Sequence, residues 1–177
     1  MIRARFARLV AAARAFAADV RRIEEVSRAG GHRFPRLAAF GDTSTIVLAL
    51  LRSGTALRAV CGSALGTRAI LRTVFQIDVW TDAIGPGLRL PHPFGIVIGD
   101  GVAIGSDCTI LHQVTLQRGA TVVGDGVTLT NQVTVLAGAT IGDGALVGAN
   151  SVVRGAIPPR AVAAGTPARL LRLVADR

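Results

Sequence analysis

The fold of this 177-residue chain is decided by IGDGVAIGSDCTILHQVTL (residues 98–116) and VGDGVTLTNQVTVLAGATIGDGALVGANSVV (residues 123–153). In both stretches an isoleucine, leucine or valine recurs every six residues, and a small or β-branched residue follows four places later. A repeat this short predicts a β-solenoid, in which each coil buries the apolar edge of its neighbour. The recurring residues are Ile98, Ile104, Ile110, Leu116, Val123, Leu129, Val135, Ile141, Val147 and Val153.

The composition divides the chain into three parts. Residues 1–76 favour an α-helical N-terminal region, because apolar residues recur there near helical spacing. Residues 77–157 are rich in glycine and β-branched residues and carry the repeat. Residues 158–177 leave the repeat at Pro158-Pro159 and form a C-terminal tail, for which we predict a short helix over residues 168–174.

Within the N-terminal region the pattern predicts three helices. The first covers residues 3–29 and ends at a pair of glycines. The second begins after Asp42-Thr43 and ends at Ser53-Gly54, and the third covers residues 55–75.

The basic charge of the chain is concentrated in its N-terminal region. Residues 1–76 hold thirteen arginines against four acidic residues, a net charge of +9, whereas residues 77–177 hold seven of each sign. These arginines are spread along helical segments that are nearly free of aromatics, which favours solvated helix faces over a nucleic-acid site. The longest apolar run, Ile46–Leu51, is far shorter than the roughly 20 residues that span a bilayer. We therefore expect a cytoplasmic protein with no integral membrane contact.

Two motifs resemble a known family. Residues 90–118 read LPHPFGIVIGDGVAIGSDCTILHQVTLQR, and residues 163–169 read AAGTPAR. They resemble the hexapeptide-repeat acyltransferases, specifically the serine acetyltransferase branch and its shorter relatives that O-acetylate polysaccharides. The resemblance implies a mainly β chain, a left-handed parallel β-helix with an N-terminal α-helical cap. It also implies acetyl-CoA as co-substrate, no metal, and a homotrimer with active sites between adjacent solenoids.

The resemblance assigns His92 as the catalytic general base. A hydroxyl is a weak nucleophile near neutral pH, and an imidazole can accept its proton. The repeat can be continued back to Leu90 with two extra residues between Ile96 and Ile98, and onward with one extra residue after Leu116. This count places four residues in one column on neighbouring coils, about 4.8 Å apart: His92, His112, Asn131 and Ala149. His112 is then either a second catalytic histidine or a polar filler, and the sequence leaves both open.

The remaining site residues follow from the resemblance. In the family, the groove beside this column holds the pantetheine arm of CoA, which assigns Asn131 and Ala149 to cofactor binding. Arg169 is assigned to the CoA phosphates, which a guanidinium binds in bidentate fashion. Asn131 can instead bond to backbone in a turn, and Arg169 can be a solvated charge. Asp42 matches an acceptor-side aspartate, with a helix N-cap as the competing interpretation.

Two departures from serine acetyltransferases bear on the acceptor. Pro91 stands where those enzymes have an aspartate, and residues 117–122 stand where they carry a glycine-rich loop with an Arg-His pair. The sequence therefore predicts an acetyl-CoA-dependent O-acetyltransferase acting on a hydroxyl of a sugar, glycan precursor or glycosylated metabolite. The alternative is serine O-acetylation for cysteine biosynthesis.

Two other classes of protein stay open. A zinc enzyme like the β-helix carbonic anhydrases needs three protein ligands. The chain has only three histidines, and one of them, His32, lies outside the repeat. A non-enzymatic scaffold is the last alternative, because solenoids offer extended binding surfaces.

Overall fold

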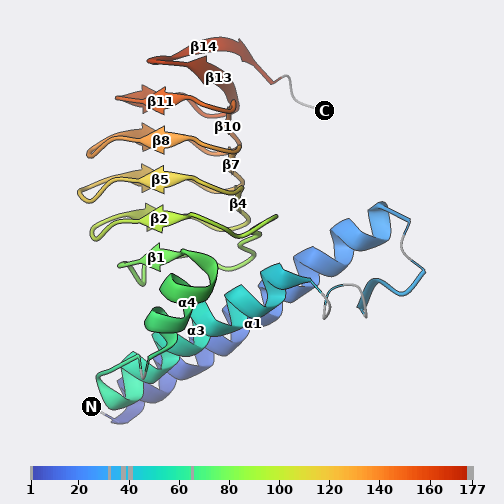
Figure 1. Cartoon of the computed structure of the whole chain (residues 1–177), viewed down its shortest axis with the longest axis vertical. Helices are drawn as coiled ribbons and strands as arrows, with labels where there is room; N and C mark the ends of the chain where they lie inside the picture. The colour runs from blue at the N-terminus through green and yellow to red at the C-terminus, as the bar shows by residue number, and fades with distance from the viewer. Residues whose placement is uncertain (1, 32, 37–38, 40–41, 65, 175–177) are drawn as a thin grey trace.

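A computed structural model of the chain describes residues 2–31, 33–36, 39, 42–64 and 66–174. It consists of a stack of β-coils that stands on a base of helices (Figure 1). The solenoid and the N-terminal helical cap predicted from the sequence are thereby confirmed.

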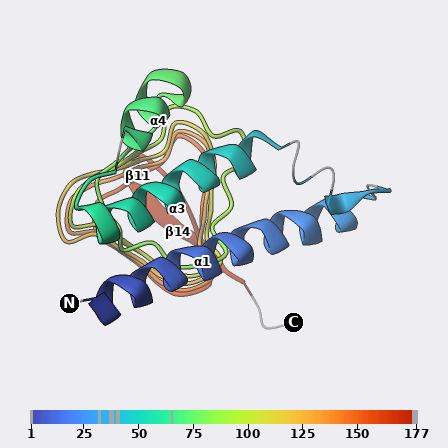
Figure 2. The ribbon, with the colours of Figure 1, turned by 90° about the horizontal axis from the view of Figure 1, so that it is seen from below.

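Three helices in the described part of the N-terminal region form the base. They are α1 (Ile2–Ala29), α3 (Thr43–Cys61) and α4 (Thr67–Phe75). The first two run antiparallel to each other beneath the first coil (Figure 2). Their buried apolar residues belong to the same core as the interior of the solenoid, so base and stack share one hydrophobic core.

The second helix is longer than the sequence predicts. α3 continues through Ser53-Gly54, the predicted stop, to Cys61, and α4 begins only at Thr67. Gly54 is buried inside α3 where α4 packs against it, and a Cβ there would lie 2.5 Å from Thr67 Oγ1. This glycine therefore allows close packing of two helices and does not end a helix.

The helix α3 also has the length and composition of a membrane span. Its mean hydropathy reaches 1.3 over the relevant window. However, Val47, Leu48 and Leu51 are buried in the shared core, and Arg52 is buried beside them. Packing inside the protein thus accounts for part of its apolar composition.

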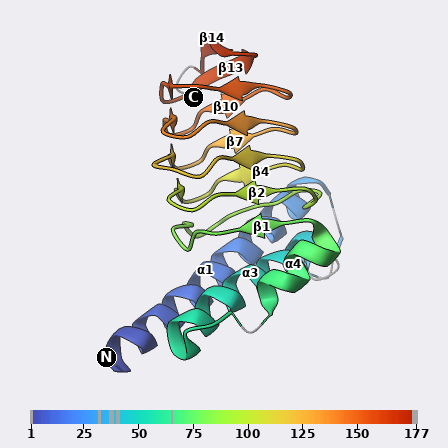
Figure 3. The same cartoon turned by 60° about the vertical axis from the view of Figure 1, so that its left-hand side comes forward.

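In the described residues, three sheets make up the faces of the solenoid, and all their neighbouring strands are parallel except β13 and β14. The first holds β1 (Asp78–Val79), β2 (Val97–Ile98), β5 (Thr115–Leu116), β8 (Thr134–Val135) and β11 (Val152–Val153). The second holds β3 (Ala103–Ile104), β6 (Val122–Val123), β9 (Thr140–Ile141) and β12 (Ala156–Ile157). The third holds β4 (Thr109–Ile110), β7 (Thr128–Leu129), β10 (Leu146–Val147), β13 (Ala161–Gly165) and β14 (Ala168–Leu173). The coils stack in one direction above the helices (Figure 3).

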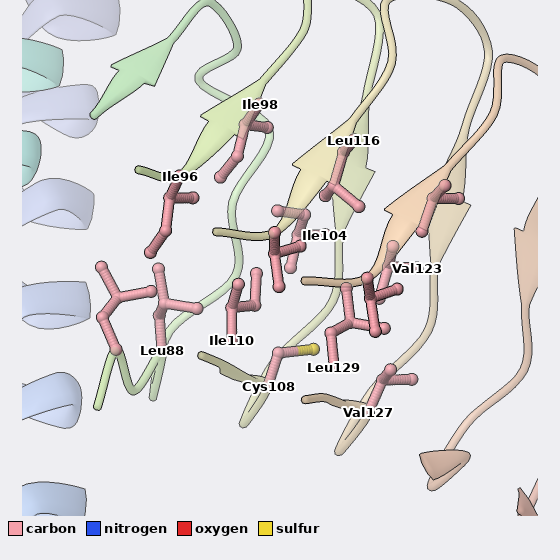
Figure 4. Close-up of a cluster of buried hydrophobic side chains, with 14 of the residues drawn as sticks. Leu88, Ile96, Ile98, Ile104, Cys108, Ile110, Leu116, Val123, Val127 and Leu129 are labelled. Atoms are coloured by element: carbon pink, nitrogen blue, oxygen red, sulfur yellow. The ribbon is translucent and has the colours of Figure 1, made fainter. Parts of the chain in front are cut away.

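The six-residue repeat forms the interior. All ten recurring residues are buried, and like positions pair from coil to coil, for example Ile110 with Leu129 and Leu129 with Val147. Figure 4 shows several of them pointing into the stack. The pairing confirms the predicted register within the repeat.

The six-residue repeat contains extra residues at two places, and the structure puts one of these places elsewhere than the sequence count does. The two extra residues that the sequence count puts between Ile96 and Ile98 belong to the corner before Ile96, which covers residues 91–95. The equivalent corner of the next coil covers only residues 111–113. Ile96 and Ile98 keep ordinary positions, since they are buried side by side in the first coil. The single extra residue lies in the corner 117–120.

The C-terminal tail differs from its predicted short helix. Residues 168–173 form β14, which runs antiparallel to β13 with Ala164 opposite Arg169. β13 extends the third sheet through its contact with β10, so its other edge carries backbone groups that need partners. A strand supplies those partners, and a helix would not.

A buried ion pair connects the helices to the first coil. Arg52 donates to the Asp19 carboxylate, with Nε to Oδ2 at 2.8 Å, and to the carbonyls of Ile84 and Gly85. Asp19 Oδ1 also accepts from the Leu88 N–H at 2.8 Å. Burial raises the pKa of Asp19, and the Arg52 guanidinium opposes that rise.

Candidate active site

His92 lies in the longer corner between the third and first sheets. Its backbone is left-handed, with φ of 53°, and its carbonyl accepts from the Phe94 N–H at 2.8 Å. Left-handed backbone recurs at the equivalent corners of the other coils, at Gln113, Gln132 and Asn150, so it belongs to the corner geometry. The imidazole is exposed at this corner.

His112 contacts His92 from the next coil. The ring centroids lie 6.4 Å apart, and the ring planes are inclined by 74°. The backbone of His112 lies in register with Phe94, because Gln113 N–H donates to the Phe94 carbonyl at 2.8 Å. The backbone of His92 is therefore not in register with that of His112. Because the corner has two extra residues, the two histidines meet only through their side chains. The predicted meeting of the two imidazoles is confirmed.

The two histidines line a pocket of about 340 Å³. The other lining residues are Gln76, Phe94, Gly95 and Gln113. Phe94 packs against Phe75 at the end of α4, with ring centroids 6.3 Å apart, so the cap contributes to one wall. Apart from the imidazoles, no lining residue has an ionisable side chain.

Asn131 and Ala149 continue the histidine side of the stack. Both follow strands of the third sheet at equivalent positions, and the Asn150 N–H donates to the Asn131 carbonyl at 3.1 Å. Asn131 is half-buried and Ala149 is exposed. Neither lines the histidine pocket, since both belong to coils farther from the helices.

Arg169 lies at the opposite end of the stack from the helices. It belongs to β14, the last strand of the third sheet, and its side chain is exposed (Figure 1). Its Nη1 donates to the Ala168 carbonyl at 3.3 Å.

Asp42 caps α3 close to the corner that carries His92. Its Oδ1 accepts from the Ser44 N–H at 2.8 Å, so the helix N-cap interpretation holds. The Ser44 hydroxyl donates to the Leu90 carbonyl at 2.8 Å, which holds the start of α3 against the strand-like segment just before His92.

Arg89 is a charged residue of this region that was not predicted from the sequence. Arg89 is half-buried beside Arg22 and Asp42. Burial lowers the pKa of Arg89, the charge of Arg22 adds to this, and the charge of Asp42 opposes it. No motif marks Arg89, and its only sequence signal is its position three residues before His92.

No metal site is evident in the part of the chain that the structure describes. No three side chains of histidine, cysteine, aspartate or glutamate converge there. His32 lies outside the described residues.

Comparisons with known proteins identify relatives of the chain. The family described as bacterial transferase hexapeptide (six repeats) matches residues 120–155. A serine acetyltransferase of Buchnera aphidicola is 36% identical over 115 residues, which cover 59% of this chain and 43% of the relative. A probable serine acetyltransferase of Oryza sativa is 42% identical over 116 residues, 61% of this chain and 38% of the relative. The chain spans about two fifths of the length of these curated relatives.

Solved structures show the same relationship over most of this chain. Soybean serine acetyltransferase complexed with serine superposes with a TM-score of 0.76 at 32% identity, covering 91% of this chain and 70% of that one. A serine acetyltransferase in complex with CoA superposes with a TM-score of 0.77 at 28% identity, covering 89% and 68%.

These relatives contradict the predicted sugar or glycan acceptor and the predicted polysaccharide O-acetyltransferase branch. The similar proteins are serine acetyltransferases in both the sequence and the structure comparison. The prediction of a sugar acceptor rested on the absence of charged groups at Pro91 and residues 117–122, although Asp42 was a candidate acceptor residue. The sequence does not show that folding brings Asp42 and Arg89 together near the His92 corner.

Proposed function

Because the chain belongs to the serine acetyltransferase family of hexapeptide-repeat transferases, we propose that it transfers the acetyl group of acetyl-CoA to the hydroxyl of serine. The observation that supports this most directly is the pocket in which His92 and His112 meet. It provides an exposed imidazole in a concave site.

His92 acts as the general base in this proposal. Its imidazole takes the proton of the serine hydroxyl while the oxygen attacks the thioester carbon. The proton then passes to the departing thiolate of CoA. Direct transfer of this kind forms no covalent bond to the protein.

Serine also carries an ammonium and a carboxylate, and we assign Asp42 and Arg89 to them. A carboxylate has two oxygens that each accept more than one hydrogen bond, so capping α3 does not exhaust Asp42. Arg89 supplies the opposite charge from the segment just before His92. An opposed pair at fixed positions is what a zwitterionic amino acid requires.

CoA extends along the third sheet in this proposal. Asn131 and Ala149 contact the pantetheine arm, and Arg169 contacts the phosphates. These residues lie progressively farther from the histidine pocket along the stack, which suits an extended cofactor. We further propose that the protein forms a homotrimer and acts in the cytoplasm.

The proposal is tested by CoA release in the presence of L-serine, measured with a thiol reagent. We expect the wild-type protein to release CoA in a serine-dependent reaction. We expect His92→Asn to lower kcat by about 10²- to 10⁴-fold, the usual contribution of a general base. Asparagine is chosen because it tolerates left-handed backbone better than alanine does. CoA affinity, measured by calorimetry, should stay largely unchanged.

The matched control is Asp107→Asn, which changes an exposed left-handed corner residue on a different edge of the solenoid. It should keep wild-type turnover. Absence of serine-dependent CoA release would contradict the proposed reaction, and full activity of His92→Asn would contradict the role of the base.

A further inference from the structure

The helix α3 has an apolar surface that its packing does not use. Only 39% of the window that gives this helix its high hydropathy is buried inside the protein. The apolar side chains left outside recur at alternating spacings of four and three residues, so they form one row along the helix. The row consists of Ile46, Leu50, Ser53, Leu57 and Val60, each exposed or half-buried.

The helix α1 has a second row beside the first. Its residues follow the same spacing, all are apolar, and Phe6 is 65% exposed. The two rows adjoin, because Leu9 and Phe16 of α1 line one groove of about 300 Å³ together with Ser53 of α3. Seen from below, α1 and α3 lie side by side, and no other helix or strand of the described chain covers them (Figure 2). The α1 row consists of Phe6, Leu9, Ala13, Phe16 and Val20.

Positive charge accompanies the apolar rows. Five arginines of α1 are exposed and have no hydrogen bond or ion pair with a described residue. Two of them, Arg14 and Arg21, line a groove on the side of α1 that faces the first coil, so they flank the α1 row. Residues 2–18 contain four arginines and no acidic residue. The five exposed arginines are Arg5, Arg8, Arg14, Arg21 and Arg28.

The acidic residues of α1 leave this charge largely uncompensated. Asp19 is buried in its pair with Arg52. Glu24 pairs with Arg36, and both Glu24 and Glu25 follow the end of the α1 row. The surface formed by the two rows and the arginines beside them is therefore both apolar and basic, and we call it the base face.

The combination of apolar and basic groups distinguishes between the molecules that could cover the base face. A second copy related by a two-fold axis would present the same face, so two regions of net charge +9 would meet. Nucleic acid would neutralise the arginines, but its phosphate backbone would leave the aliphatic rows without an apolar partner. A bilayer with anionic lipids accepts apolar side chains at the edge of its acyl region and arginines at its headgroups.

We propose that the base face binds peripherally to a membrane surface that contains anionic lipids. The two apolar rows enter the boundary between headgroups and acyl chains, and the arginines contact the lipid phosphates. The helix α3 lies along the membrane and does not cross it, because its opposite side packs into the core with Arg52 bound to Asp19. The solenoid then extends away from the membrane (Figure 1). This location goes beyond the proposed reaction and does not depend on it.

Co-sedimentation with lipid vesicles tests the proposal without any substrate. The protein is mixed with vesicles of phosphatidylcholine alone or of phosphatidylcholine with phosphatidylglycerol. We expect binding to the mixed vesicles and little binding to phosphatidylcholine alone. Binding to the mixed vesicles should weaken as the salt concentration rises, because mobile ions screen the arginines from the lipid charges.

Two double variants test the two components of the base face. Arg14→Gln with Arg21→Gln should weaken binding to the mixed vesicles by about 25-fold, since each arginine near an anionic surface contributes roughly a factor of five. Phe6→Gln with Ile46→Gln removes one exposed apolar side chain from each row and should weaken binding by about tenfold or more. All four side chains are exposed, so the unfolding midpoints should stay near that of the wild type.

The matched controls change exposed residues of the solenoid and of β14. Arg154→Gln with Arg172→Gln removes two exposed arginines, and Leu171→Gln removes a leucine that is 65% exposed. Because these residues lie away from the base face, both controls should bind the mixed vesicles as the wild type does.

Three results would overturn the proposal. The first is equal binding to the two kinds of vesicle, or binding to neither. The second is full binding by the Phe6→Gln and Ile46→Gln variant, which would indicate a purely electrostatic surface of the kind that binds nucleic acid. The third comes from light scattering at several protein concentrations: a smaller assembly for that variant than for the wild type would identify the base face as a contact between copies.

Discussion

At the scale of single residues, Asp42 is the position where structure and function are hardest to separate. Its carboxylate caps α3 through the Ser44 N–H, and the same carboxylate is our candidate partner for the serine ammonium. Asparagine caps helices about as well as aspartate does but carries no charge. One substitution therefore keeps the first role and removes the second.

We expect Asp42→Asn to raise the KM for serine by about tenfold or more, because a lost charge-assisted hydrogen bond costs roughly 1.5–3 kcal/mol. The KM for acetyl-CoA and the thermal unfolding midpoint should stay near the wild-type values. Steady-state kinetics at varied serine and acetyl-CoA concentrations measure the two KM values, and a thermal melt measures the unfolding midpoint. A cap without a role in binding predicts an unchanged KM for serine.

At the scale of elements, the corners of the solenoid depend on glycines directly after the recurring residue. A Cβ on Gly99 would lie 2.6 Å from Arg118 Cα of the next coil, and one on Gly85 would lie 2.6 Å from the Gly105 carbonyl carbon. These neighbours are backbone atoms, which cannot rotate away. Close spacing of the coils thus explains why the repeat has glycine at this position.

We expect Gly99→Ala to reduce the free energy of unfolding by about 1–3 kcal/mol, the usual cost of overpacking a tight site. The unfolding midpoint should fall by roughly 2–4 °C for each kcal/mol in a chain of this size. Gly155→Ala is the matched control, since a Cβ there meets nothing within 4 Å. Differential scanning calorimetry compares the two, and equal melting of both variants would contradict the packing argument.

At the scale of the whole molecule, the Asp19–Arg52 pair connects two helices to the first coil. Asp19 is fully buried, and the Arg52 side chain is 7% exposed. Removing one partner of a buried pair leaves an unpaired charge, which typically costs about 3–5 kcal/mol, whereas replacing both with apolar residues costs much less.

We expect Arg52→Met to destabilise the fold by about this amount, and the combined change Asp19→Leu with Arg52→Met to destabilise it less. Urea unfolding, monitored by circular dichroism, measures the free energy of unfolding of the single and the combined variant. Arg58→Met is the control, because its pair with Asp82 is more exposed and should contribute no more than about 1 kcal/mol. A combined variant less stable than Arg52→Met would contradict the argument.

The pH dependence of the Arg52→Met variant follows from the same carboxyl. Burial raises the pKa of Asp19 above the ordinary value of 3.8, so the folded state holds the proton more tightly than the unfolded state does. Stability from this proton is present at low pH and is lost as the pH rises through the folded-state pKa. The deficit of Arg52→Met should therefore shrink as the pH falls toward the ordinary value.

The solenoid and much of its histidine edge could be predicted from the sequence, because a strict repeat turns position along the chain into position in space. His92 and His112 meet as predicted, although Phe94 and not His92 lies in register with His112, and the recurring residues fill the interior. The end of α3 and the strand β14 could not be predicted in this way. Gly54 and residues 168–173 take their structure from a partner elsewhere in the chain.

By itself, the sequence determined that this protein is a β-solenoid with a helical base and a histidine at a coil corner. Those features depend on the spacing of residues along the chain, which is known without the tertiary structure. Tertiary structure decided how the two imidazoles meet and which charges gather near His92. Asp42 and Arg89 lie far apart in the chain and come together only when α3 docks on the first coil. Burial and charge pairing depend on neighbours in space, and for these residues no repeat relates sequence to position.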